Sequence, residues 1–417
     1  MPFLSIPRVL FALLSWLVLF AALYLLWSGY AGTASVTADG DVIRDREPWR
    51  VWTGSALLAW SVLGRFPVVW LTTRPGGRPI RAVRGSGRTL DGAAGSTLYV
   101  EQEGEGRTLL LVHGWGLDST IWRGLKAELR GRFRLVTWDL PGLGLSRLPK
   151  RGRPDLDLFA EELRGLVVSQ GEPIVLIGHS IGGMTIQTLA REHPDMFGRE
   201  IAGVILLNTT YTDPSRTMVL GGVVRMLRPL VKAGLALTAA LQPLAWLSAW
   251  QSYLSGSAHL ANRLGFGAEA TRDQLEHVTW LATRNPPGVQ ALGIRAMMDW
   301  DADGALAGAN CPVRVIGGEI DLVTRIEASE HIAATAPRAD LLRVPGANHM
   351  GFLEQSDVYL SEITRFCASL PWPEPPSARP FARSAAGGWG SADTRRTATV
   401  SEPEGATSPS PFRSTGD

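Results

Sequence analysis

The sequence predicts an α/β fold in which a mostly parallel central sheet carries helices on both faces. Two observations predict it: short, continuously apolar runs recur along the middle of the chain, and longer stretches of mixed polarity separate them. A strand buried on both faces is apolar without alternation, and a helix after each strand returns the chain to begin the next parallel strand. The apolar runs cover residues 109–113, 134–139, 174–178, 203–208, 313–317 and, less strongly, 340–344.

Two segments depart from this rhythm. Residues 97–103 (TLYVEQE) alternate between apolar and polar side chains, which predicts an antiparallel edge strand at the start of a domain that covers residues 97–370. Residues 209–303 form a long insert of leucine-, alanine- and tryptophan-rich helices broken by prolines, which predicts a helical cap. An arginine-rich linker, residues 74–96, precedes the domain, and a Gly/Ser/Thr/Pro-rich tail, residues 371–417, is expected to be disordered.

The beginning of the chain is its most apolar part. Residues 9–27 read VLFALLSWLVLFAALYLLW and carry no charge. About 20 apolar residues cross the hydrocarbon core of a bilayer as a helix, so residues 1–32 are predicted to be a transmembrane helix. A cleaved signal peptide is the alternative, although its apolar core normally has only about 7–15 residues.

A second apolar run, residues 51–73, follows a loop over residues 33–50. It contains Arg65 and Pro67 and is therefore a poorer span, because an arginine at mid-bilayer costs at least about 2.5–3.5 kcal/mol. Five arginines and no acidic residue follow within residues 74–88, and positive residues close to a span stay in the cytoplasm. These flanks favour a helical hairpin with the N-terminus and the large domain in the cytoplasm. The alternative is one span and an interfacial second run, which places the domain outside.

The composition excludes several kinds of protein. The formal net charge is only +2 and no stripe of lysine and arginine with interleaved aromatics is present, which argues against a nucleic-acid partner. The two cysteines, Cys311 and Cys367, are too far apart for a metal-binding motif or a disulfide framework and are predicted to be reduced and packed. The sequence therefore gives no reason to expect a metal or an organic cofactor.

A glycine-rich turn follows the apolar run at residues 174–178. It reads GHSIGG, and a helical stretch comes next. So tight a turn has no room for side chains beside the serine, and Gly178 and Gly182 supply none. The hydroxyl of Ser180 would then project at the end of the strand, where the amides at the helix N-terminus converge. The pattern predicts Ser180 as a nucleophile, next to His179, which is expected to pack rather than titrate.

A serine hydroxyl needs a base to remove its proton and a carboxylate to orient that base. After such an elbow the expected order along the chain is acid and then histidine. Asp321 follows the run at residues 313–317 and His349 follows residues 340–344, so both reach the same edge of the sheet. Asp213 is the competing acid, and Asp321 is favoured over it.

An oxyanion formed at this serine needs two N–H donors. One predicted donor is the main-chain amide of Ile181, directly after the serine. The other is the amide of Trp115 in the turn HGWG, where Gly114 and Gly116 let the backbone turn its amides inward.

Five motifs, HGWG, WDLPGLGLS, GHSIGG, GGEIDLVT and PGANHMGFLE, occur in this order. They resemble those of the α/β-hydrolase superfamily, above all its esterase, lipase and haloperoxidase-like members with a helical cap. The resemblance covers about residues 98–370, without much of the cap, and implies the triad Ser180–Asp321–His349. A serine at the elbow argues against dehalogenases and epoxide hydrolases, which use an aspartate there. The family implies no metal and no organic cofactor.

The apolar cap and the membrane segments favour a lipid-like carboxylic ester as the substrate, cleaved through an acyl-enzyme. The same triad would serve an acyltransferase, a thioesterase or a C–C bond hydrolase. A non-catalytic binding scaffold with this fold is the alternative of another class. The sequence does not predict the oligomeric state.

Overall fold

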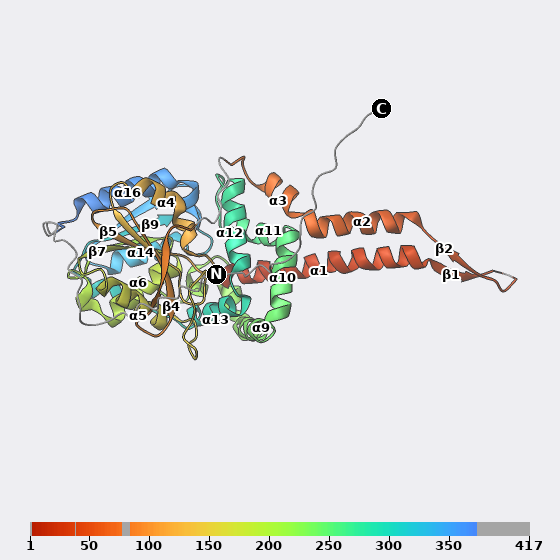
Figure 1. Cartoon of the computed structure of the whole chain (residues 1–417), viewed down its shortest axis with the longest axis horizontal. Helices are drawn as coiled ribbons and strands as arrows, with labels where there is room; N and C mark the ends of the chain where they lie inside the picture. Colours follow the sequence, from red (N-terminus) through yellow and green to blue (C-terminus); the bar gives the residue numbers. More distant parts are fainter. Residues whose placement is uncertain (1, 38, 77–83, 373–417) are drawn as a thin grey trace, which may run out of the picture. The chain divides into compact units, whose positions relative to one another are not determined.

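The computed structural model of the chain describes residues 2–37, 39–76 and 84–372 (Figure 1). Most of the tail that is expected to be disordered, from residue 373 onward, lies outside the described residues, as does part of the predicted arginine-rich linker, residues 77–83.

An eight-stranded sheet forms the centre of the large domain. Its strand order is β10-β9-β8-β7-β5-β6-β4-β3, and the six strands from β10 to β6 are parallel to their neighbours. The mostly parallel sheet is therefore confirmed. Its strands are β3 (Gly87–Asp91), β4 (Thr97–Glu103), β5 (Thr108–Val112), β6 (Arg134–Trp138), β7 (Ile174–His179), β8 (Ile201–Leu207), β9 (Val313–Gly318) and β10 (Ala339–Val344).

Strand β4 is antiparallel to β6, as predicted, but it is not the edge of the sheet. Strand β3 pairs outside it, with Leu90 opposite Leu98. β3 lies within residues 74–96, which the sequence assigns to a linker. Its sequence GRTLD contains one apolar residue, and four of its five residues are exposed, so no hydrophobic pattern marks it. The strand forms because its main chain pairs with the free edge of β4 through hydrogen bonds.

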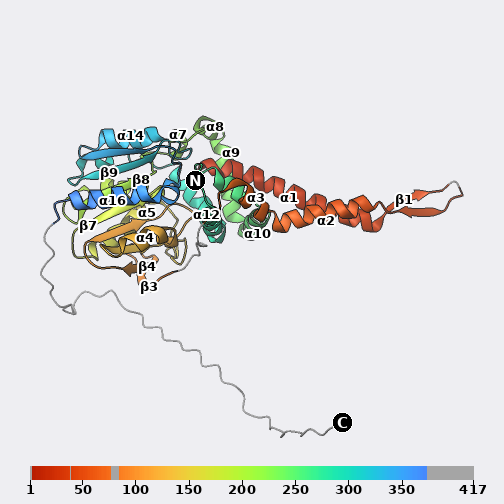
Figure 2. The same cartoon turned by 90° about the horizontal axis from the view of Figure 1, so that it is seen from above.

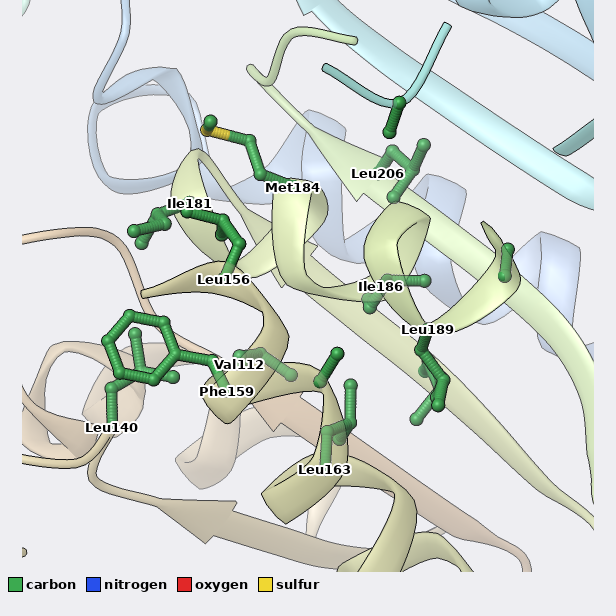
Figure 3. Close-up of a cluster of buried hydrophobic side chains, with 14 of the residues drawn as sticks. Val112, Leu140, Leu156, Phe159, Leu163, Ile181, Met184, Ile186, Leu189 and Leu206 are labelled. Carbon is green, nitrogen blue, oxygen red and sulfur yellow. The ribbon is translucent and has the colours of Figure 1, made fainter. Parts of the chain in front are cut away.

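Helices cover both faces of the sheet (Figure 2). Successive strand residues point to opposite faces, so that Leu110 and Leu176 belong to one buried cluster, and Leu111 and Ile177 to the other. α5, α6 and α14 pack on the first cluster, part of which is shown in Figure 3, and α4 and α16 on the second. These helices are α4 (Arg123–Leu129), α5 (Leu156–Val168), α6 (Ile181–Glu192), α14 (Ile326–Thr335) and α16 (Ser356–Ser369), with the short α15 (Gly351–Glu354) before α16 and 3-10 turns η1 (Ser119–Trp122), η2 (Pro194–Met196) and η3 (Ala305–Gly308).

Seven helices lie between β8 and β9 and form the cap. They fall within the insert that the sequence marks at residues 209–303. They are α7 (Pro214–Thr217), α8 (Gly221–Met226), α9 (Arg228–Ala240), α10 (Gln242–Leu254), α11 (Ser257–Arg263), α12 (Arg272–Arg284) and α13 (Pro287–Met297).

The N-terminal region consists of α1 (Pro2–Ala31), a hairpin of β1 (Thr33–Val36) and β2 (Val42–Asp45), α2 (Pro48–Leu63) and α3 (Arg65–Thr72). Among the described residues, one helix, over Val9–Ala31, is long and apolar enough to cross a membrane. The pairs α2–α3 and α9–α10 are long and apolar enough only when the two helices of each pair are taken together, and the pairs are bent by 65° and 102°.

Helices α1 and α2 run side by side (Figures 1 and 2). A glycine permits their close approach: a side chain at Gly54 of α2 would lie only 3.1 Å from the carbonyl oxygen of Ala22 on α1. Small residues at a contact are typical of helices that pack within a bilayer.

Arg65 stands at the break between α2 and α3. Its Nη1 lies 3.1 Å from Oε1 of Glu276 on α12 and donates to the hydroxyl of Tyr253 on α10. The second apolar run is therefore not one straight helix, and its arginine has polar partners in the cap. This pairing removes much of the cost that an isolated arginine in an apolar segment would carry.

The two cysteines are free and buried, as predicted. Burial raises the pKa of each thiol to about 12, so neither is a thiolate at neutral pH.

Candidate active site

The elbow at Ser180 joins the end of β7 to the start of α6. Ser180 has φ 54° and ψ −119°, a conformation that is rare for a residue with a side chain. The backbone is so close-packed that a side chain at Gly178 would lie 2.6 Å from the carbonyl carbon of Gly182. One at Gly182 would lie 2.1 Å from the carbonyl oxygen of Val112 on β5. Glycine at both positions is what allows the strained serine.

Asp321 and His349 meet at the same edge of the sheet. The Nδ1 atom of His349 lies 3.0 Å from Oδ2 of Asp321, and both side chains are fully buried. Oδ1 of Asp321 accepts hydrogen bonds from the main-chain amides of Val323 and Thr324 at 2.7 and 2.8 Å. The hydroxyl of Thr324 donates a hydrogen bond to Oδ2 at 2.8 Å. Burial by itself raises the pKa of Asp321, but His349 and the donors from Thr324 outweigh it and hold this pKa below its usual value. Asp321 is therefore a carboxylate that accepts a hydrogen bond from Nδ1–H of His349.

The other ring nitrogen of His349 is unoccupied. Within the described part of the chain, Nε2 is buried and has no hydrogen-bond partner. With Nδ1 protonated, Nε2 carries the lone pair of a neutral imidazole and can take a proton. A general base has this arrangement.

His179 links the elbow to the loop of His349. Its Nε2 lies 3.0 Å from the main-chain oxygen of His349, and because a carbonyl only accepts, Nε2 is the donor. The two rings are also in contact, with centroids 4.9 Å apart, and Phe352 packs on His179 at 4.6 Å. Burial is the main reason why the pKa of His179 falls well below its ordinary value, so the ring is neutral. His179 thus packs as a neutral ring between the elbow and Phe352.

Asn208 is a member of this site that the sequence analysis missed. It follows β8 with φ 46°, and its Nδ2 donates to Oδ2 of Asp321 at 3.1 Å and to the carbonyl of Asn348 at 3.2 Å. The hydroxyl of Tyr359, on α16, donates to its Oδ1 at 2.8 Å and so fixes the amide. The available signal was a polar residue at the end of an apolar run, one strand away from the elbow, since such residues reach the same edge of a parallel sheet.

Asp213, the competing acid, is engaged elsewhere. It caps α7, where its carboxylate accepts the amide and the hydroxyl of Ser215, both at 2.8 Å. Arg228 lies 3.3 Å from the same carboxylate. The structure brings Asp321, and not Asp213, to His349.

The two amides predicted as oxyanion donors are unengaged. Among residues 84–372, neither the amide of Trp115 nor that of Ile181 donates a hydrogen bond. His113 supports the turn that carries Trp115, since its Nε2 accepts the amide of Leu140 at 3.0 Å and its Nδ1 donates to the carbonyl of Gly114 at 2.9 Å. Burial keeps the pKa of His113 below its ordinary value, which is consistent with this neutral form.

The cap holds both loops of the site in place. Asn285, which follows α12, donates to the carbonyls of Gly116 and Leu117 at 3.0 and 3.1 Å. Asn348 donates to the carbonyls of Leu264 and Phe266 at 3.1 and 3.0 Å. Trp115 contacts α13 directly, because its Nε1 donates to the Gln290 carbonyl at 3.1 Å.

A family model described as the alpha/beta hydrolase family matches residues 109–362, well over half of the chain. The chain belongs to the alpha/beta hydrolase family. This membership confirms the predicted fold and the predicted class of enzyme, a hydrolase.

The relatives of this hydrolase include esterases. It is 29% identical over 276 residues to the pimeloyl-[acyl-carrier protein] methyl ester esterase of Nitrosospira multiformis, covering 65% of this chain and 98% of that protein. Among solved structures it is similar to an esterase from Exiguobacterium antarcticum (TM-score 0.57, 17% identity, 68% of this chain, all of the other). It is also similar to an enol-lactonase from Burkholderia xenovorans (TM-score 0.55, 20% identity, 68% and all of the other). At these identities the two structures support the fold of the hydrolase.

Proposed function

We propose that this protein is a membrane-anchored serine hydrolase that cleaves a carboxylic ester through an acyl-enzyme. Ser180 is the nucleophile, His349 the base, and Asp321 the carboxylate that orients the base. The observation that carries the proposal is the Asp321–His349 pair, held through His179 beside the serine elbow, with Nε2 of His349 free to accept a proton. The methyl ester esterases among the relatives support an ester as the bond that is cleaved.

The reaction runs in two halves. Oγ of Ser180 attacks the carbonyl carbon of the ester while its proton passes to Nε2 of His349, and the amides of Ile181 and Trp115 stabilise the oxyanion. The alcohol leaves with the proton from Nε2, which gives an acyl-enzyme. Water then attacks the acyl carbon and gives a proton to Nε2 of His349. His349 passes this proton to Oγ of Ser180 as the carboxylic acid departs.

Labelling with a fluorophosphonate tests this assignment. The wild-type protein should react at Ser180, and Ser180→Ala should not react. Ser329→Ala is the matched control, because Ser329 is a fully buried serine on α14 outside the site, and it should label like wild type. Labelling that persists in Ser180→Ala contradicts the proposal and assigns the nucleophile to another residue. No labelling of the wild-type protein also contradicts it and favours a non-catalytic scaffold.

The membrane part of the proposal rests on composition and exposure. The span Val9–Ala31 is apolar, and large side chains of α9 and α10 in the cap are exposed, among them Leu230, Leu237, Leu244 and Leu247. Exposed apolar surface on this scale is costly in water and favourable in a bilayer. A lipid-like ester is the substrate that fits this setting.

We propose a cytoplasmic catalytic domain, with the β1–β2 hairpin on the other side of the membrane. Both native cysteines are buried, so an introduced cysteine can report accessibility without background. Asp41→Cys in the hairpin should react with an impermeant maleimide on intact cells, and Glu105→Cys, in the exposed loop before β5, only after lysis. The reverse pattern places the domain outside.

A further inference from the structure

A cavity of about 730 Å³ lies between α1 and the cap. Pockets of this size hold small organic ligands. Among its lining residues none is charged. α1 and α13 each contribute one face, with residues spaced by three and four positions. These are Val9, Ala12, Leu13, Trp16 and Phe20 of α1, and Pro287, Gln290, Ala291 and Ile294 of α13.

Helix α1 is fixed against α10 by side-chain hydrogen bonds. The hydroxyl of Ser15 donates to that of Ser255 at 2.8 Å and accepts from Nε2 of Gln251 at 3.2 Å. Nε1 of Trp16 donates to the hydroxyl of Ser248 at 3.2 Å. Polar pairs within otherwise apolar helices set their register, so α1 is a built wall of this cavity and not a loose tether.

The inner wall of the cavity also contacts the predicted oxyanion turn. Gln290 lines the cavity, and its main-chain carbonyl accepts the indole N–H of Trp115. One turn further along α13, a side chain at Gly293 would lie 2.0 Å from the Trp115 ring, which shows how closely the helix covers that turn. Helix α13 therefore borders both the cavity and the turn of Trp115 beside the Ser180 elbow.

The outer rim of the cavity is apolar and open. Leu13 and Phe20 of α1, and Leu244 and Leu247 of α10, are each between 55% and 62% exposed. A water-soluble acidic carrier would find no basic side chain among the residues that line this cavity. A hydrocarbon chain within a bilayer would reach it without crossing water, because α1 has the length and composition of a membrane span.

We propose that this cavity binds the acyl chain of a membrane-resident ester, so that the membrane helix α1 forms one wall of the substrate site. The inference rests on the proposed hydrolase function and identifies where the apolar part of the substrate lies. The ester group would then extend past Gln290 and Trp115 toward Ser180. The preference for the length of the acyl chain should therefore depend on α1 and α10 together.

A matched pair of substitutions on α1 tests the wall. Leu13 lines the cavity and is 62% exposed, whereas Leu17, one turn later, is 65% exposed and is not a lining residue. The kcat/KM ratio for p-nitrophenyl laurate over p-nitrophenyl acetate is measured on the full-length protein in vesicles. Leu13→Trp should lower this ratio roughly tenfold for every two methylene groups displaced, and Leu17→Trp should leave it at the wild-type value. Equal ratios in the two variants overturn the inference, while Ser180 labelling leaves the proposed function standing.

Cross-linking on the wild-type protein does not depend on how a variant folds. An alkyl fluorophosphonate with a diazirine at the end of a twelve-carbon chain bonds to Oγ of Ser180 as fluoride leaves, and light then inserts the chain end into its neighbours. Peptide mapping should find inserts in residues 9–20 of α1 and in α10. Inserts confined to other segments overturn the inference. Absence of any label at Ser180 overturns the proposed function, and the inference with it.

Discussion

The Nε2–H of His179 donates to the main-chain carbonyl of His349 at 3.0 Å. The residue before the proposed nucleophile thus binds the backbone of the residue proposed as its base. Asp321 fixes the ring of His349, and His179 fixes its backbone, so the loop after β10 has little freedom to move away from the elbow.

The first prediction concerns this link. His179→Phe keeps a ring against Phe352 but loses the hydrogen bond, and leaves the His349 carbonyl buried without its donor. We expect kcat to fall about tenfold with little change in KM, because the loss of such a bond costs on the order of 1–3 kcal/mol and acts on the base. Steady-state kinetics on a soluble p-nitrophenyl ester measures it. Trp300→Phe removes a buried hydrogen bond to Thr188 outside the site and should leave kcat unchanged; an equal loss in both variants would mean a general packing effect.

The second prediction separates the two candidate acids. Asp321→Asn should lower kcat by about 10³–10⁴-fold, because an amide no longer enforces the tautomer of His349 or stabilises its charged form. Asp213→Asn keeps a capping oxygen for the Ser215 amide and removes only the charge facing Arg228, so it should cost less than about 1 kcal/mol of stability with kcat retained. A larger kinetic loss in Asp213→Asn than in Asp321→Asn would reverse the assignment.

The third prediction follows from the lowered pKa of His179. This pKa is about 6.5 in the unfolded chain and lies well below that value in the folded protein. As the pH falls below about 6.5, His179 becomes protonated in the unfolded chain but stays neutral in the native state. The free energy of unfolding therefore decreases as the pH falls from about 6.5 to the pKa of His179 in the native state.

His179→Phe should therefore be less sensitive to pH than wild type. A proton bound only by the unfolded chain lowers the free energy of unfolding by up to about 1.4 kcal/mol per pH unit. The difference in free energy of unfolding between wild type and His179→Phe should therefore narrow by about 2 kcal/mol from pH 7.5 to pH 5. Denaturant unfolding at both pH values measures it. The carboxyl of Asp321, with its lowered pKa, titrates below this window. A difference that stays constant would mean that His179 is protonated in the native state.

The fourth prediction concerns Asn208, which donates to Asp321 and to the loop of His349. Asn208→Gly tolerates the φ of 46° but removes both hydrogen bonds. We expect kcat to fall about tenfold and the acid limb of the kcat–pH profile to move, since the carboxylate loses a donor. Tyr359→Phe should give a smaller change in the same direction, because it only frees the Asn208 amide. An unchanged pH profile in both variants would restrict Asn208 to a structural role.

The fifth prediction tests how α3 is held against the cap. Arg65→Met removes a half-buried pairing with Glu276 and should lower the free energy of unfolding by about 1 kcal/mol. Arg74→Met is the control, because Arg74 and Glu269 are both about half exposed and such pairs contribute little. Thermal unfolding in detergent measures both. Equal shifts would show that the Arg65 contact does not anchor α3.

Several features followed from the sequence alone because local physical chemistry determines them. The six continuous apolar runs predicted strands, and they form the parallel part of the sheet; β10, at its edge, is partly exposed. The GHSIGG turn is dictated by sterics, since Gly178 and Gly182 are positions where a side chain has no room. The placement of Ser180, Asp321 and His349 at one edge of the sheet was readable because each follows a strand of the parallel part, and parallel strands end at one edge.

Other features were decided only by the tertiary structure. Strand β3 has no apolar pattern and exists because β4 offers it hydrogen bonds. Asn208 became part of the site because its strand lies between those of Ser180 and Asp321, which no spacing in the sequence expresses. The sequence alone predicts a free-energy cost for Arg65 within an apolar run. The fold places Glu276, more than two hundred positions later, beside it as a partner. The periodic pattern of a sequence indicates which face of a helix or strand is buried. Long-range packing determines which other helices and strands that face contacts.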